Sequence, residues 1–157
     1  MLLLIALSLL NLVFSNTLSA GSEAEDIATK KCLYISSYHR GYEWSDGIEA
    51  GIRETLKGHC ELRQIDMDTK RNKSPEFIFA ATNKAIKAIE DWKPDIVLTS
   101  DDNAAKHIIA PHYKDDDIPF VFSGVNWTVE EYGFPYSNVT GIVEVSPYKS
   151  MLSLIHI

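Results

Sequence analysis

The chain has 157 residues, of which 15 are lysine or arginine and 22 are aspartate or glutamate, so its formal net charge is −7. This acidic balance argues against a nucleic-acid-binding surface, which needs gathered lysines and arginines. The one basic cluster, residues 70–73, lies close to Asp66 and Asp68 and is interpreted as a solvated loop. The length suffices for one domain with its own hydrophobic core.

The first 20 residues carry no charge and consist mainly of apolar side chains, with small residues up to Ala20. This composition predicts a secretory signal peptide (residues 1–20) that is cleaved near Ala20. A basic segment at the start is missing, so an uncleaved anchor is the alternative, although polar residues such as Asn11 interrupt the apolar run. We expect the mature protein to be periplasmic or otherwise extracytoplasmic, with a linker over residues 21–30.

Short apolar runs alternate with helical patterns through the rest of the chain. We expect strands at residues 32–35, 61–67, 95–99, 118–122 and 139–145. We expect helices at residues 45–57, 74–92 and 103–110. Ser74 and Pro75 supply a cap and a first-turn proline for the second helix, and Pro111 is expected to end the third. The second strand is the most polar and is therefore predicted to lie at an edge, whereas the third is typical of a central parallel strand.

This alternation predicts an α/β fold, a doubly wound parallel sheet with helices on both faces. Ligands of such sheets bind in the crevice outside the carboxyl ends of the strands. Three predicted loops would meet there, at residues 36–44, 99–103 and 123–127, and they are rich in aromatic, hydroxyl and carboxylate side chains. The sequence therefore predicts a binding surface at this edge.

The sequence contains no GxSxG, HExxH, Walker or GxGxxG motif, and its five histidines lack metal-ligand spacing. Asp101 and Asp102 could suggest acid–base chemistry. An equally good explanation is that one of them caps the following helix and the other interacts favourably with the dipole of that helix. We therefore expect a binding protein rather than an enzyme, with no cofactor and no metal.

Cys32 and Cys60 form a candidate disulfide, because export permits one and the two residues lie at the starts of strands expected to be neighbours. Two independent thiols are the alternative. That alternative is slightly favoured, because the side-chain directions on adjacent parallel strands must also match for a bond to form.

Four segments together resemble the substrate-binding proteins of ABC transporters, which have the type I periplasmic binding protein fold. They are YISSYHRGYEWSDGIEAGI, DMDTKRNKS, PDIVLTSDDNAAKHIIAPHYKDDDIPFVFSGVNW and YGFPYSNVTGIVEV. The resemblance covers residues 31–145 and implies the first of two α/β lobes that close on a small-molecule ligand. It also implies delivery of the ligand to a membrane permease. Residues 146–157 would start the next helix towards the hinge, and the chain is expected to be a fragment with one lobe; the genuineness of residues 153–157 is in doubt.

The resemblance implies a ligand-binding wall built from residues that follow strands one, three and four. These are Ser37, Tyr38, Trp44, Asp101, Asp102, Asn103, Asn126 and Trp127. Aromatic rings offer apolar surface and cation–π attraction, carboxylates pair with an ammonium group, and helix-start amides receive a carboxylate. An amino-acid-like ligand fits these groups better than a sugar does, although any single aromatic residue could equally serve core packing.

Related domains also occur as extracytoplasmic sensor modules of histidine kinases and diguanylate cyclases, so a ligand-binding sensor domain is the alternative function. A small hydrolase or epimerase on a similar fold is a third hypothesis, which a nucleophile–base pair at the predicted edge would support.

Overall fold

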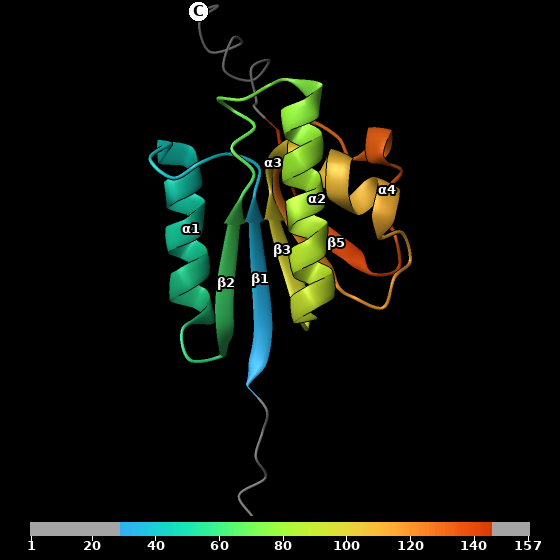
Figure 1. The fold of residues 1–157 in the computed structure, drawn as a ribbon. Coiled ribbons are helices and arrows are strands. Elements are labelled where there is room, and N and C mark those ends of the chain that lie inside the picture. The colour runs from blue at the N-terminus through green and yellow to red at the C-terminus, as the bar shows by residue number, and fades with distance from the viewer. Residues whose placement is uncertain (1–28, 146–157) are drawn as a thin grey trace, which may run out of the picture.

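The computed structural model describes residues 29–145, which form one five-stranded sheet with helices packed against it (Figure 1). The predicted signal peptide, most of the predicted linker and residues 146–157 lie outside the described residues. All five strands are parallel, in the order β2-β1-β3-β4-β5. The predicted α/β class and parallel sheet are confirmed, and so is the edge position of β2.

The strands are β1 (Lys30–Ser36), β2 (Cys60–Asp66), β3 (Ile96–Ser100), β4 (Phe120–Asn126) and β5 (Val139–Glu144). A row of buried side chains crosses the sheet, since Leu33 pairs with Val97, Val97 with Phe120, and Phe120 with Val139. Fully burying each such side chain contributes about 1.5–3 kcal/mol, so this row anchors the register of four strands.

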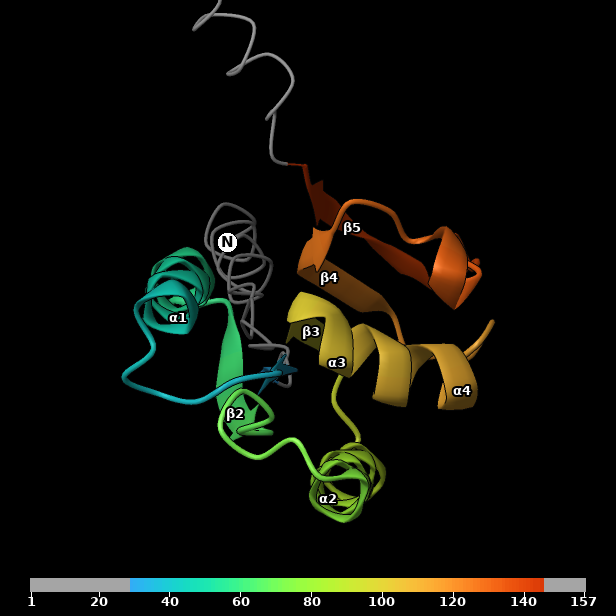
Figure 2. The same ribbon diagram turned by 90° about the horizontal axis from the view of Figure 1, so that it is seen from above.

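The helices lie on both faces of the sheet. Figure 2 shows α1 (Glu43–Leu56) on one face and α2 (Pro75–Trp92) on the other. Ser74 caps α2 by accepting a hydrogen bond from the backbone N–H of Phe77, and Pro75 occupies the first helical position, as predicted. Ala85 and Ile89 of α2 are buried against the central strands and complete the main hydrophobic core.

The third helical segment is longer than predicted and continues through Pro111. It comprises α3 (Asp101–Ala104), the π-helical turn η1 (Ala105–Ile109) and α4 (Ala110–His112). A proline has no N–H to donate and its ring crowds the preceding turn of a regular α-helix. The wider π turn comes directly before Pro111, with the Ala110 N–H bonded to the Ala105 carbonyl, and the helical segment therefore does not end at the proline.

Strand β4 also extends beyond its predicted end at residue 122. Its pairing with β5 shifts between Phe122 and Val125, which marks a bulge, and Gly124 lies there with a φ of 68°. Glycine adopts this left-handed conformation without steric cost, so the strand resumes after the bulge and reaches Asn126. Residues 123–126 were predicted as loop; that boundary is wrong. The short 3-10 helix η2 (Glu130–Tyr132) then leads towards β5.

Cys32 and Cys60 form a disulfide, with their Cα atoms 6.0 Å apart. Lys30 is the register partner of Cys60, so the bond joins β1 and β2 diagonally across two residues near the amino ends of both strands. The candidate disulfide is confirmed, and the slightly favoured alternative of two free thiols is wrong. Among the helices of residues 29–145, none is long and apolar enough to cross a membrane.

Candidate functional site

The loop after β1 and the junction of β3 with α3 meet at the carboxyl edge of the sheet, and Ser37 holds them together. Its N–H donates to the Ser100 carbonyl at 3.2 Å, and its hydroxyl donates to the same oxygen at 2.5 Å. The hydroxyl also accepts a hydrogen bond from the Ala104 N–H. Because Ser37 is fully buried and its hydroxyl is occupied by backbone groups, it positions the loops instead of facing a ligand.

Asp101 occupies the turn between β3 and α3. Its φ of 65° is unusual for a residue other than glycine, and the residue is only 4% exposed. The indole Nε1 of Trp44 donates a 3.0 Å hydrogen bond to Oδ1 of Asp101. The second oxygen, Oδ2, is buried and has no hydrogen-bond partner among the described residues.

Gly124 of the β4 bulge lies directly beside this pair. A Cβ at that position would lie 3.5 Å from Oδ1 of Asp101 and 3.6 Å from the indole ring of Trp44. The bulge therefore places backbone without a side chain beside the carboxylate and the indole. The start of α1, the start of α3 and the middle of β4 thus meet around one carboxyl group.

Burial raises the pKa of Asp101 to about 6, and the neighbouring charge of Asp102 adds to the rise. The hydrogen bond from Trp44, the polar hydroxyl of the neighbouring Ser100 and the charge of Lys70 oppose it in part. Tyr38 lies near the same carboxylates; burial, followed by the charges of Asp101 and Asp102, raises the pKa of its phenol to about 12. At neutral pH the site therefore presents a carboxylate that is costly to keep charged, beside a phenol that stays protonated.

Asp102 has partners of its own. Its carboxylate accepts hydrogen bonds from the Tyr132 hydroxyl at 2.9 Å and from both the backbone N–H and the side-chain amide of Asn126. These bonds join the start of α3 to the end of β4 and to η2. Asp102 and Asn126, both predicted for the ligand wall, are thus hydrogen-bonded to each other.

Tyr38, Tyr42 and Lys70 form a second part of the site. The two tyrosine rings meet edge to face with centroids 5.6 Å apart. The Lys70 ammonium lies 4.8 Å and 4.6 Å from the Tyr38 and Tyr42 centroids, and it donates to the Tyr42 hydroxyl. Sequence reasoning missed Tyr42 and Lys70. The interpretation of Lys70 as part of a solvated loop overlooked that its loop leaves the carboxyl end of β2, beside the loop that follows β1.

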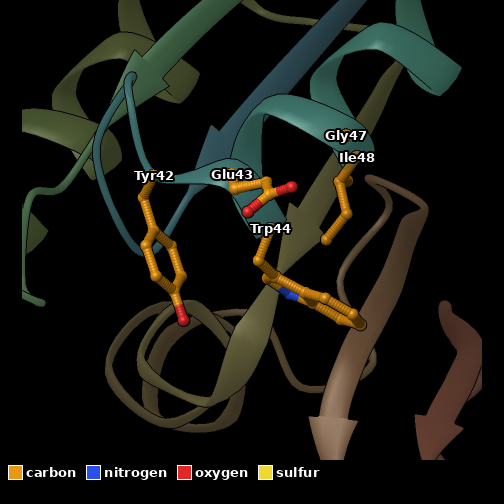
Figure 3. A pocket seen from close by; sticks show the side chains of 5 residues that line it. All are labelled: Tyr42, Glu43, Trp44, Gly47 and Ile48. Carbon is orange, nitrogen blue, oxygen red and sulfur yellow. The ribbon is translucent and has the colours of Figure 1, made fainter.

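A shallow surface hollow of about 550 Å³ lies at the start of α1. Figure 3 shows Tyr42 and Trp44 projecting from this helix start to the same side, with the Glu43 carboxylate between them. Ile48 lies one helical turn further on and completes an apolar wall with the indole. The exposed part of Trp44, 43% of the residue, is therefore available beside Asp101.

The two remaining predicted residues lie further from this centre. Asn103 donates to the Thr69 hydroxyl at 2.8 Å and lines a groove next to α2. Trp127 follows β4 and is 56% exposed, and its backbone N–H donates to the Glu144 carbonyl. The structure thus gathers Tyr38, Trp44 and Asp101 as the centre of the candidate site.

Within residues 29–145, no group of three or more His, Cys, Asp or Glu side chains is arranged to hold a metal ion. In comparisons with known proteins, no family model, no curated protein and no solved structure matches the chain. The candidate site is therefore assigned a function from its geometry and chemistry.

Proposed function

We propose that the protein is the extracytoplasmic solute-binding component of an ABC transporter and that residues 31–145 form one of its two ligand-binding lobes. The ligand is a small polar molecule with an ammonium group, of which an amino acid is the simplest kind. The observation that carries this proposal is the buried carboxylate of Asp101, with one oxygen bonded to Trp44 and the other without a partner.

The position of Asp101 in the topology supports this proposal. The chain leaves β1 towards β2 on one side and returns to β3 on the other side of β1. At such a switch point the connections leave on opposite faces, and a crevice opens at the carboxyl ends of the two strands. Here α1 and α3 leave on opposite faces (Figure 2). Asp101 directly follows β3, and Tyr38 comes two residues after the end of β1.

The charges at the site suit a zwitterion. An ammonium group would pair with the Asp101 carboxylate and would remove the cost of its unpartnered oxygen. The Lys70 ammonium, held over two tyrosine rings, could receive the carboxylate of the same ligand. The rings of Tyr38 and Trp44 offer flat surfaces for the ligand side chain, and their attraction for cations also favours the ammonium end.

In the proposed transporter a second lobe closes over this edge, and the loaded protein delivers its ligand to a membrane permease without chemical change. One lobe supplies only part of the contacts, while most of the entropy cost of holding the ligand remains. We therefore expect the 157-residue chain to bind its ligand no more tightly than about 1 mM, or about −4 kcal/mol.

The test is a calorimetric and NMR titration of the protein with amino acids, the matching amines without a carboxylate, and sugars. Amino acids should shift the signals of Trp44 and Tyr38, and Asp101→Asn should abolish the shifts. Asp95→Asn is the matched control. Asp95 is an exposed aspartate directly before the amino end of β3, whereas Asp101 directly follows its carboxyl end, and the Asp95 carboxylate pairs with Lys30.

Two results would contradict the proposal. Sugars binding in preference to amino acids, or unchanged binding in Asp101→Asn, would remove the role of the carboxylate. Micromolar affinity of this chain alone would mean that one lobe forms the complete site. That result would contradict the proposal that a second lobe is needed for tight binding.

A further inference from the structure

A second concave surface lies away from the Trp44–Asp101 pair. A groove of about 720 Å³ runs between α2 and the helical segment that comprises α3, η1 and α4. Both helical segments lie on the face of the sheet opposite α1 (Figure 2). Of the residues predicted for ligand binding, Asn103 is the one that lines this groove.

The polar lining of the groove is cationic or neutral. Lys106 and His107 come from the π turn, and His112 comes from α4. Among the described residues that line it there is no aspartate or glutamate, although the whole chain has a net charge of −7. Pro75, the first residue of the 18-residue helix α2, also lines the groove, so the positive end of that helix dipole lies beside it.

The hydroxyl of Thr82, which lines the groove, makes no hydrogen bond to any described residue. Thr82 of α2 is 6% exposed, and its hydroxyl is buried without a hydrogen-bond partner in the part of the chain that the structure describes. A buried hydroxyl without a partner costs roughly 1–3 kcal/mol. An acceptor atom in the groove could relieve that cost.

The rest of the lining is apolar. Ile78, Phe79 and Pro111 contribute to it, and Phe79 is 67% exposed. A large apolar side chain left in water beside a cationic rim favours a ligand that has an apolar body as well as a negative charge.

We propose that the groove between α2 and the helical segment 101–112 is a second binding site, for a small organic anion whose carboxylate or phosphate meets Lys106, His107 and the Thr82 hydroxyl. Its apolar body lies on Phe79 and Ile78. The π turn is part of this site, because Lys106 and His107 both belong to it. The site is independent of the proposed transport ligand, which binds at the carboxyl edge.

The experiment is an NMR titration of the full chain with phenyl phosphate, benzoate and benzylamine, which carry the same ring with different charges. At least one of the two anions should give saturable shifts at Lys106, His107 and Thr82, and the stronger of them identifies the preferred anionic group. Benzylamine should give none.

The pKa of His107 offers a second measurement. Burial and the neighbouring Lys106 lower this pKa in the free protein. A bound anion favours the protonated imidazole, so it should raise this pKa. Lys106 and His112 are the other charged or titratable side chains that line the groove.

Lys106→Ala should weaken binding of the preferred anion about tenfold, the effect of one lost charge-assisted hydrogen bond. Lys84→Ala is the matched control, because Lys84 is an exposed lysine of α2 that does not line the groove. Thr82→Val keeps the side-chain shape and should weaken binding about threefold. Failure of both anions to saturate, equal binding of benzylamine, or equal losses in Lys106→Ala and Lys84→Ala would overturn the proposal.

Discussion

The indole of Trp44 and the carboxylate of Asp101 are joined by a 3.0 Å hydrogen bond across 57 positions of the chain. The bond connects the first turn of α1, on one face of the sheet, to the first residue of α3, on the other face (Figure 2). It satisfies one oxygen of a carboxylate that is otherwise enclosed, and it holds the indole beside the surface hollow at the start of α1. Several measurable properties depend on this pair.

The first prediction concerns the pH dependence of stability. The pKa of Asp101 is raised to about 6 in the folded protein, from an ordinary value of 3.8. The folded state therefore binds the proton more tightly, so the contribution of Asp101 to stability is greatest at low pH and is lost as the pH rises through 6. In Asp101→Asn this dependence disappears. The free energy of unfolding of the variant, relative to the wild type, should be higher at pH 8 than at pH 4.5 by about 2 kcal/mol.

Urea unfolding at the two pH values measures this difference. Asp95→Asn should show almost no difference between these two pH values, because hydrogen bonds from Lys30 and the Lys31 backbone lower the pKa of Asp95 from 3.8, and both measurements lie above that value. Its carboxylate stabilises the fold above the unfolded pKa, and that contribution is lost as the pH falls. A pH-independent difference for Asp101→Asn would contradict the assignment of a buried, destabilised carboxylate.

The second prediction concerns Trp44→Phe, which keeps an aromatic ring but removes the Nε1 donor. The variant should unfold about 1–3 kcal/mol more easily at pH 8, because both oxygens of a buried carboxylate then lack a partner. At pH 4.5, where most of the carboxyl groups are protonated, the cost should be smaller. Chemical denaturation at both pH values checks this, and an equal cost at the two would indicate lost packing rather than the lost hydrogen bond.

A third prediction follows from the disulfide between Cys32 and Cys60. The bond closes a loop with a sequence separation of 28 residues, which in the chain-entropy model stabilises the folded state by about 3.5 kcal/mol. Thiol titration of the denatured, unreduced protein should find no free thiol. Reduction should lower the urea midpoint, while the NMR signals of Trp44 and Asp101 should stay unchanged, because the bond lies near the amino ends of the strands. Two titratable thiols would refute the pairing.

The fourth prediction contrasts two glycines of neighbouring strands. Gly124→Ala places a Cβ in ordinary contact with Asp101 and Trp44, so its cost is mainly that of the left-handed backbone, roughly 1–2 kcal/mol. In Gly141→Ala the new Cβ would overlap the Phe122 carbonyl and ring, and either the backbone or the ring must move. Thermal unfolding should therefore show a clearly larger loss for Gly141→Ala, and equal losses would contradict the close packing of β4 and β5.

Much of the sheet could be predicted from local patterns. The run from Asp95 to Thr99 is apolar enough to indicate a central strand, and the polar second strand indicates an edge. With β2 at the edge beside β1, β3 pairs with the other side of β1, and the right-handed crossover rule then places α1 and α2 on opposite faces. Ser74 and Pro75 fixed the start of α2 because a cap and a first-turn proline act over only a few residues.

The features that escaped prediction depend on contacts between distant parts of the chain. Lys70 lies over Tyr38 and Tyr42 because two loops meet at the carboxyl edge, and no local pattern encodes that meeting. The helix continues through Pro111 because a π turn precedes it, an uncommon geometry that sequence reasoning does not expect. The family resemblance predicts Ser37 in the ligand wall, whereas the residue is buried and hydrogen-bonded to another strand, a long-range contact that the sequence does not reveal.

The bulge in β4 has a consequence for the phase of that strand. Phe122 and Val125 are three positions apart, yet both are buried, because the inserted residue at Gly124 reverses the alternation of side chains. The two halves of β4 are therefore out of phase with each other. Inserting one further residue here would turn Val125 towards the opposite face and detach Asn126 from Asp102. Deleting Gly124 would keep Val125 on the core face, but it would remove the bare backbone that lies beside Asp101 and Trp44. Tolerance to insertions and deletions should thus be lowest at a position that looks, in the sequence, like an ordinary loop.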